Sequence, residues 1–521
     1  MNYYYSGNEY ISLINIEENL SINGLTFLSM GLNGNVFIDC KIYLKFFNKA
    51  GPVDFKNASF NMVNYWIPEI IIKTRGSEEI RINLLTPKEQ RGFIYNITGK
   101  NIRAELHFEY KNLFLNINAS HKLDPLCEIY DNKWFNQAVY KFLHGSSLFC
   151  IAIDAGKKGT YKIMKNKIIA SCSGKSGEIN FNVGISTEDM GAISSCVHFR
   201  RFGYDYFHDE LNNWLSEKVS RYENKNVEKI YNTSLFFNYF FSNGKTIDTD
   251  EIVCVTSRSP EYYVSGAYWD RDAFLWSFPA ILIIDDRRAR EMLDYAFKIQ
   301  GKNFGVHSRQ INGNMLECGF ELDELCAPFL ALKSYINKTG DTGLLKKEEV
   351  NTILSHIKDK FFKHKHKVYM LFKTELRPSD DMSSCFYNTY DNVLTWQTFI
   401  TLSYFHKLLK NDKESMMWKK IAQTTRNDLK KFSIDKKNRI ISYEFDTKGK
   451  HILYEEPPGS LRLLEFYGFI DNDIRPYYKK TMKWSYSKQN PYFYYRKICE
   501  SGCEHAKYPW PLSAANSLFT T

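Results

Sequence analysis

The first 205 residues alternate between short apolar runs and polar turns. Examples are residues 34–47, 104–120 and 159–171, where Ile, Val, Phe and Tyr are separated by Gly, Asn, Asp and Lys. Many short strands joined by frequent turns are typical of antiparallel sheets packed face to face. The pattern therefore predicts an antiparallel β-sandwich domain over residues 1–205.

After residue 205 the apolar residues follow a helical period. Residues 206–225 are expected to form a helical linker, and residues 226–521 a helical domain. The expected helices cover residues 206–222, 228–244, 272–284, 286–300, 321–337, 342–362, 392–410, 414–431 and 473–486, with a weaker one near Trp510. Helical hairpins in series after a sandwich predict an (α/α)6 toroid, whose active site lies where the hairpin loops converge. A helical array without a closed ring is the alternative.

Composition and charge exclude several classes of function. The net charge is +10, but 69 basic residues are interspersed with 59 acidic ones, which argues against a nucleic-acid stripe. No signal-peptide pattern opens the chain, and Phe274–Ile284, the most apolar stretch, is too short to span a bilayer. Eleven scattered cysteines are typical of reduced thiols. We expect a soluble cytoplasmic protein without a nucleic-acid or membrane partner; the oligomeric state stays open.

Two loops between the predicted helices carry an aromatic residue with charged neighbours. Trp269, Arg271 and Asp272 lead into one helix, where an aromatic plate and an Arg–carboxylate pair suit a sugar. A purely structural role, with Asp272 capping the helix, is equally open. Glu321 and Asp323 open the next helix, where they also favour the helix dipole.

Three later loops concentrate carboxylates. Residues 377–381, Arg-Pro-Ser-Asp-Asp, place Asp380 beside Asp381, and repulsion between them suits a general acid, although a capping turn is the simpler interpretation. Glu455 and Glu456 precede a double proline. The last such loop holds Glu500, Glu504, His505 and Trp510. Cys499, Cys503 and His505 lack a second ligand pair of matching spacing, so we expect no metal and no cofactor.

In this order the five loops resemble glycoside hydrolase family 125, the metal-independent exo-α-1,6-mannosidases. Residues 268–272 are similar to the family's Met-Trp-Leu-Arg-Asp, and residues 320–328 to its aromatic-Glu-Leu-Asp-Ser-Leu-Cys-Tyr-Pro. Residues 377–381 repeat Arg-Pro-Ser-Asp-Asp, and Asn392 follows at the family's spacing. Residues 443–446, 455–456 and 490–492 also have counterparts. The resemblance covers about residues 256–521, whereas the sandwich is closer to glucoamylase-like relatives.

The resemblance implies an inverting exo-α-glycosidase, with an α-mannoside as the first substrate to consider. One carboxylic acid would protonate the leaving oxygen while a second carboxylate activates water. The match makes Asp381 or Asp380 the acid. The terminal sugar would be held by Trp269, Arg271, Asp272, Glu321, Asp323, Arg377, His505 and Trp510.

The identity of the general base is open. The family's base is a glutamate in a His-Glu-Ser segment that follows an aromatic-Trp-His-Ile helix opening. If residues 508–512 correspond to that opening, the last hairpin and the base are absent, which agrees with about ten predicted helices where a ring needs twelve. A rival alignment pairs Glu500 and the segment 509–519 with the family's Glu-Ser and the helix after it, so that Glu500 or Glu504 is the base.

Three other hypotheses remain. An α-glucosidase or an inverting phosphorylase is the nearest enzyme alternative, and phosphate-dependent turnover would distinguish the phosphorylase. A truncated, inactive protein that binds carbohydrate would retain affinity without turnover. A purely structural helical protein predicts that Arg271, Asp323, Asp380 and Asp381 do not converge.

Overall fold

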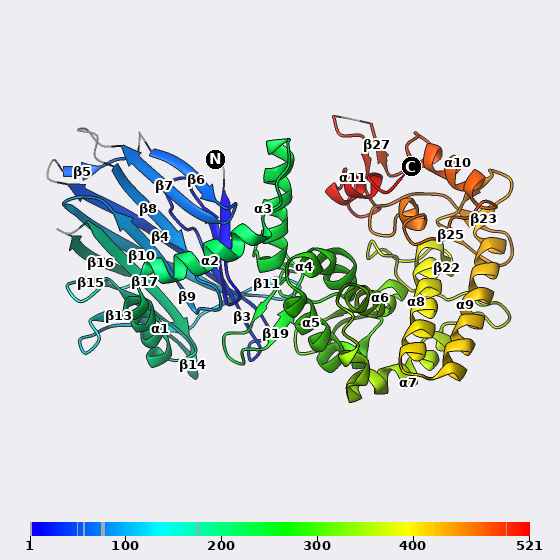
Figure 1. Ribbon diagram of the computed structural model, residues 1–521, viewed down its shortest axis with the longest axis horizontal. Coiled ribbons are helices and arrows are strands. Elements are labelled where there is room, and N and C mark those ends of the chain that lie inside the picture. Colours follow the sequence, from blue (N-terminus) through cyan, green and yellow to red (C-terminus); the bar gives the residue numbers. More distant parts are fainter. Residues whose placement is uncertain are drawn as a thin grey trace. The chain divides into compact units, whose positions relative to one another are not determined.

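The computed structural model describes residues 3–48, 51–55, 58–73, 79–174, 177–495 and 497–520 (Figure 1). The chain divides into two compact units. Unit 1 comprises Met1–Tyr268, Ala280–Asp285 and Gln310–Asn312, and unit 2 comprises Trp269–Pro279, Asp286–Arg309 and Gly313–Thr521. The domain boundaries predicted from the sequence, at residues 205 and 225, stay a prediction.

Unit 1 contains two large antiparallel sheets. The nine-stranded sheet has the order β1-β2-β3-β4-β10-β16-β15, with β5 beside β4 and β11 beside β10. Its strands are β1 Tyr4–Gly7, β2 Ile11–Ile16, β3 Leu25–Ser29, β4 Gly34–Asn48, β5 Gly51–Val53, β10 Ile102–Asn116, β11 Ser120–Leu123, β15 Thr160–Met164 and β16 Lys167–Gly174. The eight-stranded sheet has the order β12-β13-β14-β17-β9-β8-β7-β6. Its strands are β6 Ala58–Val63, β7 Ile67–Lys73, β8 Glu79–Leu85, β9 Gly92–Thr98, β12 Leu126–Asn132, β13 Gln137–His144, β14 Ser146–Asp154 and β17 Glu178–Ser186.

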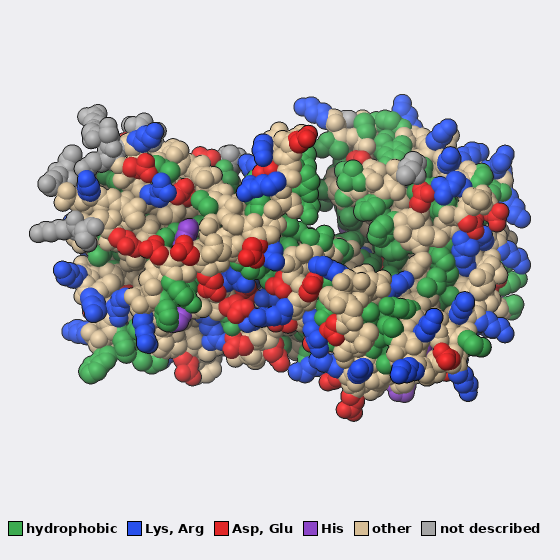
Figure 2. Space-filling model, in the orientation of Figure 1, with side chains coloured by type: hydrophobic (Ala, Val, Ile, Leu, Met, Phe, Trp, Pro, Cys, Tyr) green, Lys and Arg blue, Asp and Glu red, His purple; other side chains and the backbone are tan. Residues whose placement is uncertain are grey.

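Alternation along the strands builds the core of unit 1. In β4, Ile38, Cys40, Ile42 and Leu44 are buried while the residues between them are partly exposed. A period of two directs these side chains to one face of the sheet. They join a single hydrophobic cluster with side chains of the other sheet, such as Phe181. The predicted β-rich N-terminal region is therefore confirmed as two sheets around a common core. On the face shown in Figure 2, acidic and basic side chains lie side by side over this unit.

Three helices complete unit 1: α1 Asp189–Phe202, α2 Tyr204–Lys218 and α3 Lys225–Phe241. The β-like pattern read up to residue 205 missed α1, which packs on β14 and β17 through Ala192, Ile193 and Cys196. Gly184 of β17 makes this approach possible, because an added Cβ would lie 2.3 Å from the carbonyl oxygen of Ala192. The short strands β18 Asn243–Lys245 and β19 Ile252–Cys254 follow.

Unit 2 is mainly helical. Its helices are η1 Arg271–Ser277 (a π-helix), α5 Asp286–Tyr295, η2 Ala296–Gln300, η3 Gly301–Asn303, α6 Leu322–Thr339, η4 Gly343–Lys346, α7 Glu348–Lys363, α8 Thr389–Leu408, α9 Asp412–Phe432, η5 Leu461–Leu464, α10 Arg475–Ser485 and α11 Pro511–Ser517. Helix α4, Phe278–Ile284, continues η1 and is divided between the two units. Each segment predicted as a helix after residue 205 contains one.

The helices of unit 2 are arranged so that every second one lies in an inner row. Helix α6 contacts both η1 and α8, α8 contacts η5, and η5 contacts α11. Helix α9 packs along α8, and α7 along η2. This order is an arc of helical hairpins. Closure into a full (α/α)6 ring stays a prediction.

Small antiparallel sheets of two or three strands lie in the segments between the helices of unit 2. They are β20 Val306–Arg309 with β21 Met315–Phe320, β22 Tyr387–Asn388 with β25 Glu444–Phe445 and β26 His451–Ile452, β23 Ile434–Asp435 with β24 Ile440–Ile441, and β27 Phe493–Tyr494 with β28 Glu500–Ser501. All eleven cysteines lie among the described residues, and none forms a disulfide. Within the described part of the chain, no helix has the length and apolar character needed to cross a bilayer.

Candidate active site

The start of η1 is held by a carboxylate from another helix. The backbone N–H groups of Asp270 and Arg271 donate to Glu324 of α6, over 2.5 and 3.2 Å. The first N–H groups of a helix have no acceptor within it, so a buried glutamate satisfies them here. Arg309, at the end of β20, forms ion pairs with Asp270 and Glu324. These hydrogen bonds and ion pairs fix the position of the Arg271 backbone, from which its side chain extends.

The Arg271 side chain donates hydrogen bonds to three carboxylates from two loops. Its Nη1 donates to Glu321 Oε2 over 2.6 Å and to Asp323 Oδ2 over 2.8 Å, and its Nη2 donates to Asp380 Oδ1 over 2.6 Å. The Arg271 side chain is only 2% exposed, whereas Asp380 is 47% exposed. The sequence suggested that the Arg271 guanidinium would donate hydrogen bonds to two sugar hydroxyls. In the structure the guanidinium donates to carboxylates instead. Their remaining oxygens are acceptors suited to hydroxyl groups.

Burial and charge oppose each other in this cluster. Burial alone would lower the pKa of Arg271, but Asp323 and Glu321 hold it well above its usual value. Burial raises the pKa of Glu321, and Arg271 and His307 counteract part of that rise. His307 Nδ1 is hydrogen-bonded to Glu321, and this contact raises the pKa of His307 against the opposing effect of burial. Burial also raises the pKa of Asp272 to about 7, although Arg271 opposes it.

The loop at residues 377–381 directs its two aspartates to different partners. Asp380 has a φ of 66°, in the left-handed region. The backbone N–H of Asp380 donates to Arg377 O over 2.8 Å, and that of Arg377 to Asp381 O over 2.8 Å. Since the chain reverses tightly at Asp380, this residue reaches Arg271 while Asp381 faces the segment near residue 505. The structural-protein hypothesis predicted that these residues do not converge. Asp323 and Asp380 both contact Arg271, which contradicts that prediction for these three residues.

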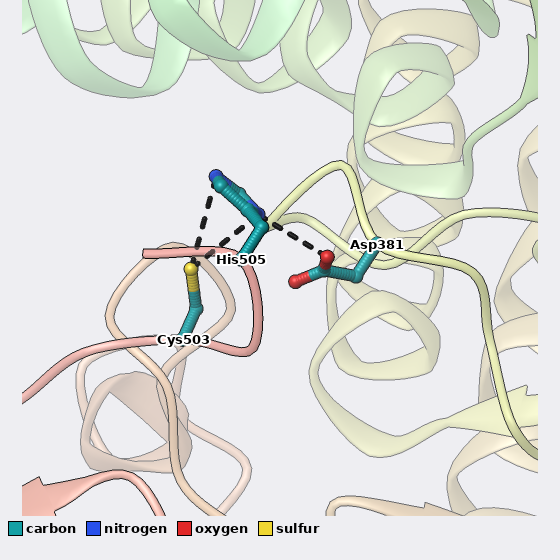
Figure 3. A group of neighbouring side chains, drawn as sticks. All are labelled: Asp381, Cys503 and His505. Atoms are coloured by element: carbon teal, nitrogen blue, oxygen red, sulfur yellow. Dashed lines mark hydrogen bonds and ion pairs between the residues drawn. The ribbon is translucent and has the colours of Figure 1, made fainter. Parts of the chain in front are cut away.

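Asp381 lies among residues of the C-terminal segment (Figure 3). Its Oδ1 is 3.2 Å from Nδ1 of His505, and Cys503 Sγ lies 3.6 Å from the same nitrogen. Arg377 is buried; its Nη2 donates to Glu504 over 2.5 Å and lies 3.4 Å from Asp381 Oδ2. Within the described residues, Asp381, Cys503 and His505, and separately His307, Glu321 and Asp380, are the groups whose donor atoms lie close enough for a metal ion.

Ser379 joins Asp381 to a second buried carboxylate. The Ser379 hydroxyl lies 3.1 Å from Asp381 Oδ2 and 2.9 Å from Glu456 Oε1, and Tyr443 donates to the same Glu456 oxygen over 2.9 Å. Burial raises the pKa of Glu456 to about 7, although Arg377 opposes that rise. Near pH 7 the Glu456 carboxyl is therefore partly protonated, and the Ser379 hydroxyl lies between it and Asp381.

The two predicted bases have different surroundings. Glu500 accepts hydrogen bonds from Arg462 over 3.0 Å, from Ser513 over 2.7 Å and from Ser517 over 3.2 Å. Glu504 is 58% exposed and has Arg377 as its ionic partner. The neighbouring Glu455 is buried, and burial raises its pKa to about 7.

The two predicted aromatic residues are largely inside the protein. Trp269 is only 6% exposed, and its ring meets His307 edge to face at 5.8 Å. Trp510 meets His505 edge to face at 6.2 Å, and its Nε1 donates to Ala506 O over 3.3 Å. Each ring therefore packs against a histidine of one of the two carboxylate clusters. The role of either as a flat plate for a sugar stays a prediction.

Sequence reasoning missed four titratable residues: His307, whose side chain is 12% exposed, and the buried Arg309, Glu324 and Asp391. His307 and Arg309 lie in the loop between two predicted helices, the same kind of position that drew attention to the other loops. Glu324 and Asp391 gave no such signal, because each lies inside a helix. Neither oxygen of the fully buried Asp391 has a hydrogen-bond partner among the described residues. Burial, together with Asp323 and Glu321, raises the pKa of Asp391 well above its usual value.

Comparison with known proteins found similar glycosidases. Residues 362–521 match the sequence model of the family described as metal-independent alpha-mannosidase (GH125). The search of curated proteins found no match. A metal-independent alpha mannosidase structure, a Streptococcus pneumoniae non-productive complex with α-1,6-mannobiose, is similar with a TM-score of 0.52 at 16% identity, over 61% of this chain and 86% of that one.

A bacterial glucoamylase complexed with acarbose has a TM-score of 0.51 at 11% identity, over 81% of this chain and 66% of that one. At these identities both likenesses concern the fold. The glucoamylase alignment covers more of this chain than the mannosidase alignment, as expected for a protein with a sandwich before its helices. The sequence match over residues 362–521 confirms the resemblance to glycoside hydrolase family 125, and by that match the chain is a glycosidase.

Proposed function

We propose that this glycosidase is an inverting, exo-acting enzyme that releases a terminal sugar from α-mannosides. The observation that carries the proposal is the meeting of Arg271, Glu321, Asp323 and Asp380, from three loops far apart in sequence, beside Asp381. Buried carboxylates fixed by one guanidinium can accept several hydrogen bonds from sugar hydroxyls at once. The family match supports the choice of mannose.

Asp381 is the better general acid of the two adjacent aspartates. A general acid must hold a proton near the working pH. Asp380 is bound directly by the Arg271 guanidinium, so its Oδ1 is already occupied by a hydrogen bond within the protein. Asp381 is 14% exposed and shares Ser379 with Glu456, so a proton can reach it through one hydroxyl. Ser379 and Glu456 therefore support proton return to Asp381 after each turnover.

Glu500 is the better general base. An inverting enzyme keeps its two carboxyl groups roughly 6.5–9.5 Å apart, to leave space for water. One Glu504 oxygen and one Asp381 oxygen lie 2.5 and 3.4 Å from the same Arg377 nitrogen, so these oxygens are at most 5.9 Å apart. Glu500 accepts from three donors, and a carboxylate has about four acceptor positions, which leaves one for a water. Its ion pair with Arg462, at 3.0 Å, holds the carboxylate in place.

The test is release of mannose from α-1,6-linked mannobiose by the purified chain, with product anomers followed by proton NMR. We expect the β-anomer first, since inversion reverses the configuration. Asp381→Asn should lower turnover by about 10²–10⁴-fold. Glu500→Gln should do the same, whereas the matched change Glu504→Gln should leave most activity. The α-anomer first, turnover only with added phosphate, or loss on Glu504→Gln but not on Glu500→Gln would contradict the assignment.

A further inference from the structure

Three metal-ligand side chains meet where the acid loop approaches the C-terminal segment. Asp381 comes from the loop before α8, and Cys503 and His505 come from one short turn before α11. Figure 3 shows the carboxylate and the thiol on either side of the imidazole. All three donor atoms lie within 4.8 Å of one another. Carboxylate, thiolate and imidazole together are a ligand set that Zn²⁺ accepts.

The distances fit a tetrahedral ion bound through Nδ1 of His505. Bonds of about 2.3 Å to sulfur and about 2.1 Å to nitrogen and oxygen, at the tetrahedral angle, separate sulfur from nitrogen by about 3.6 Å and nitrogen from oxygen by about 3.4 Å. The structure has 3.6 Å between Cys503 Sγ and His505 Nδ1, and 3.2 Å between that nitrogen and Asp381 Oδ1. Small adjustments of the side chains would complete three corners of a tetrahedron.

The turn that carries two of the ligands is built tightly. Cys503 N–H donates to Ala506 O over 3.2 Å, and Tyr508 N–H donates to the same oxygen over 2.9 Å. A Cβ on Gly502 would lie 2.6 Å from that oxygen, so glycine is needed beside the first ligand. The backbone therefore holds Cys503 and His505 near each other without the ion.

The charges around this group also favour a divalent cation. Asp381 and Glu504 flank Arg377, and ionisation of Cys503 would bring the local sum to two negative charges. The Cys503 thiol is buried and lies beside the imidazole of His505. A bound metal would replace its proton. The other trio, His307, Glu321 and Asp380, differs because Arg271 already holds both of its carboxylates.

We propose that Asp381, Cys503 and His505 form an inhibitory binding site for a thiophilic divalent cation such as Zn²⁺. The ion would occupy the Asp381 oxygen that faces His505, and so would remove the proposed general acid from the reaction. This consequence rests on the proposed function, whereas binding of the ion does not. It agrees with turnover that needs no metal, because the ion acts only as an inhibitor.

The test uses Co²⁺ as the probe, added to the full chain after treatment with a chelator. A Co²⁺–thiolate bond gives a charge-transfer band in the near ultraviolet. We expect that band to saturate at one equivalent of Co²⁺ and to disappear when Zn²⁺ is added. Absence of the band, or a band that Zn²⁺ does not displace, would overturn the proposal, whatever the enzymatic activity of the chain.

Variants assign the ligands. Cys503→Ser should abolish the band, whereas Cys499→Ser, which removes an exposed thiol four residues away, should preserve it. Because Cys503 is buried, a second variant guards against misfolding: His505, which is 47% exposed, can be changed to Gln. His505→Gln should weaken Co²⁺ binding by about 100-fold or more, since even changes outside the ligand shell cost 10–100-fold. Loss of the band in Cys499→Ser, or unchanged binding in His505→Gln, would refute the assignment.

Activity tests the inhibitory consequence separately. Zn²⁺ should inhibit mannose release by the unmodified chain, and a chelator should restore it. Cys503→Ser should retain its basal turnover and lose most of its sensitivity to Zn²⁺. Zn²⁺ inhibition of equal strength in Cys503→Ser would show that the inhibiting ion binds elsewhere. If the chain released no mannose at all, the proposed function would fail while the Co²⁺ band still decided the metal site.

Discussion

Replacing Arg271 with Met tests whether one guanidinium holds the carboxylate cluster together. Asp380 is half-exposed and can turn to water, and Glu321 keeps its contact with His307. Asp323 is fully buried, and within the described residues its remaining hydrogen bond is the one it accepts from the Glu324 backbone N–H over 2.9 Å. Removing one partner of a buried ion pair costs about 3–5 kcal/mol, so Arg271→Met should lower the unfolding free energy by that amount at pH 8.

The loss should depend on pH with a definite sign. Arg271 lowers the pKa of Glu321 against burial, so its removal raises the folded-state pKa further above the unfolded value. A carboxyl group with a raised folded-state pKa stabilises the fold at low pH and loses that contribution as the pH rises. Arg271→Met should therefore be less harmful at pH 5 than at pH 8.

Urea denaturation followed by tryptophan fluorescence at both pH values measures this effect. The matched control is Arg287→Met, which removes a guanidinium that is 67% exposed and lies 3.3 Å from Glu291. Exposed ion pairs contribute about 0–1 kcal/mol, so the control should change little. A cost for Arg271→Met that equals the control, or a cost independent of pH, would refute the reasoning.

Three further changes test other parts of the structure. Glu456→Gln should flatten the loss of stability between pH 5 and pH 8 by about 2.5 kcal/mol, because over most of that range the folded carboxyl, with a pKa of about 7, keeps its proton while the unfolded carboxyl is ionised; an unchanged pH profile in urea titrations would contradict this. Asp391→Asn should raise the melting temperature more at pH 8 than at pH 5, since Asn resembles the protonated acid and the stability lost by Asp391 grows as the pH rises above its unfolded pKa; a lower melting temperature at both pH values would contradict it. Gly184→Ala should cost about 1–3 kcal/mol in thermal unfolding, because the new Cβ would meet Ala192 O of α1 at 2.3 Å; a neutral result would show that α1 can move.

Helix α1 and the loop at residue 307 show where local patterns were insufficient. Residues 189–202 lie within a region whose strands dominate the pattern, and the helix exists because its small residues pack on β14 and β17. His307 stands in a polar loop like several others, and only its contact with Glu321 distinguishes it. In both cases the deciding contact comes from residues distant in sequence.

The sequence by itself determined the order of the elements and the loops that hold the charged residues. Apolar periodicity is a local property, and it predicted a β-rich region over residues 1–205 and helical segments that contain α2–α11. The motif at residues 377–381 likewise identified the two adjacent aspartates. These features follow from side chains a few positions apart, which a single sequence displays directly.

Only the tertiary structure decided how these charged residues are partnered. The left-handed turn at Asp380 divides two adjacent carboxylates between Arg271 and His505, and the sequence Arg-Pro-Ser-Asp-Asp does not specify that division. The burial of Trp269, and the meeting of Cys503 with Asp381, depend on segments brought together by packing. Ion pairs and groups of metal-ligand side chains form between residues that are close in space. Helix packing brings such residues together even when, like Arg271 and Asp380, they are more than 100 residues apart in the chain.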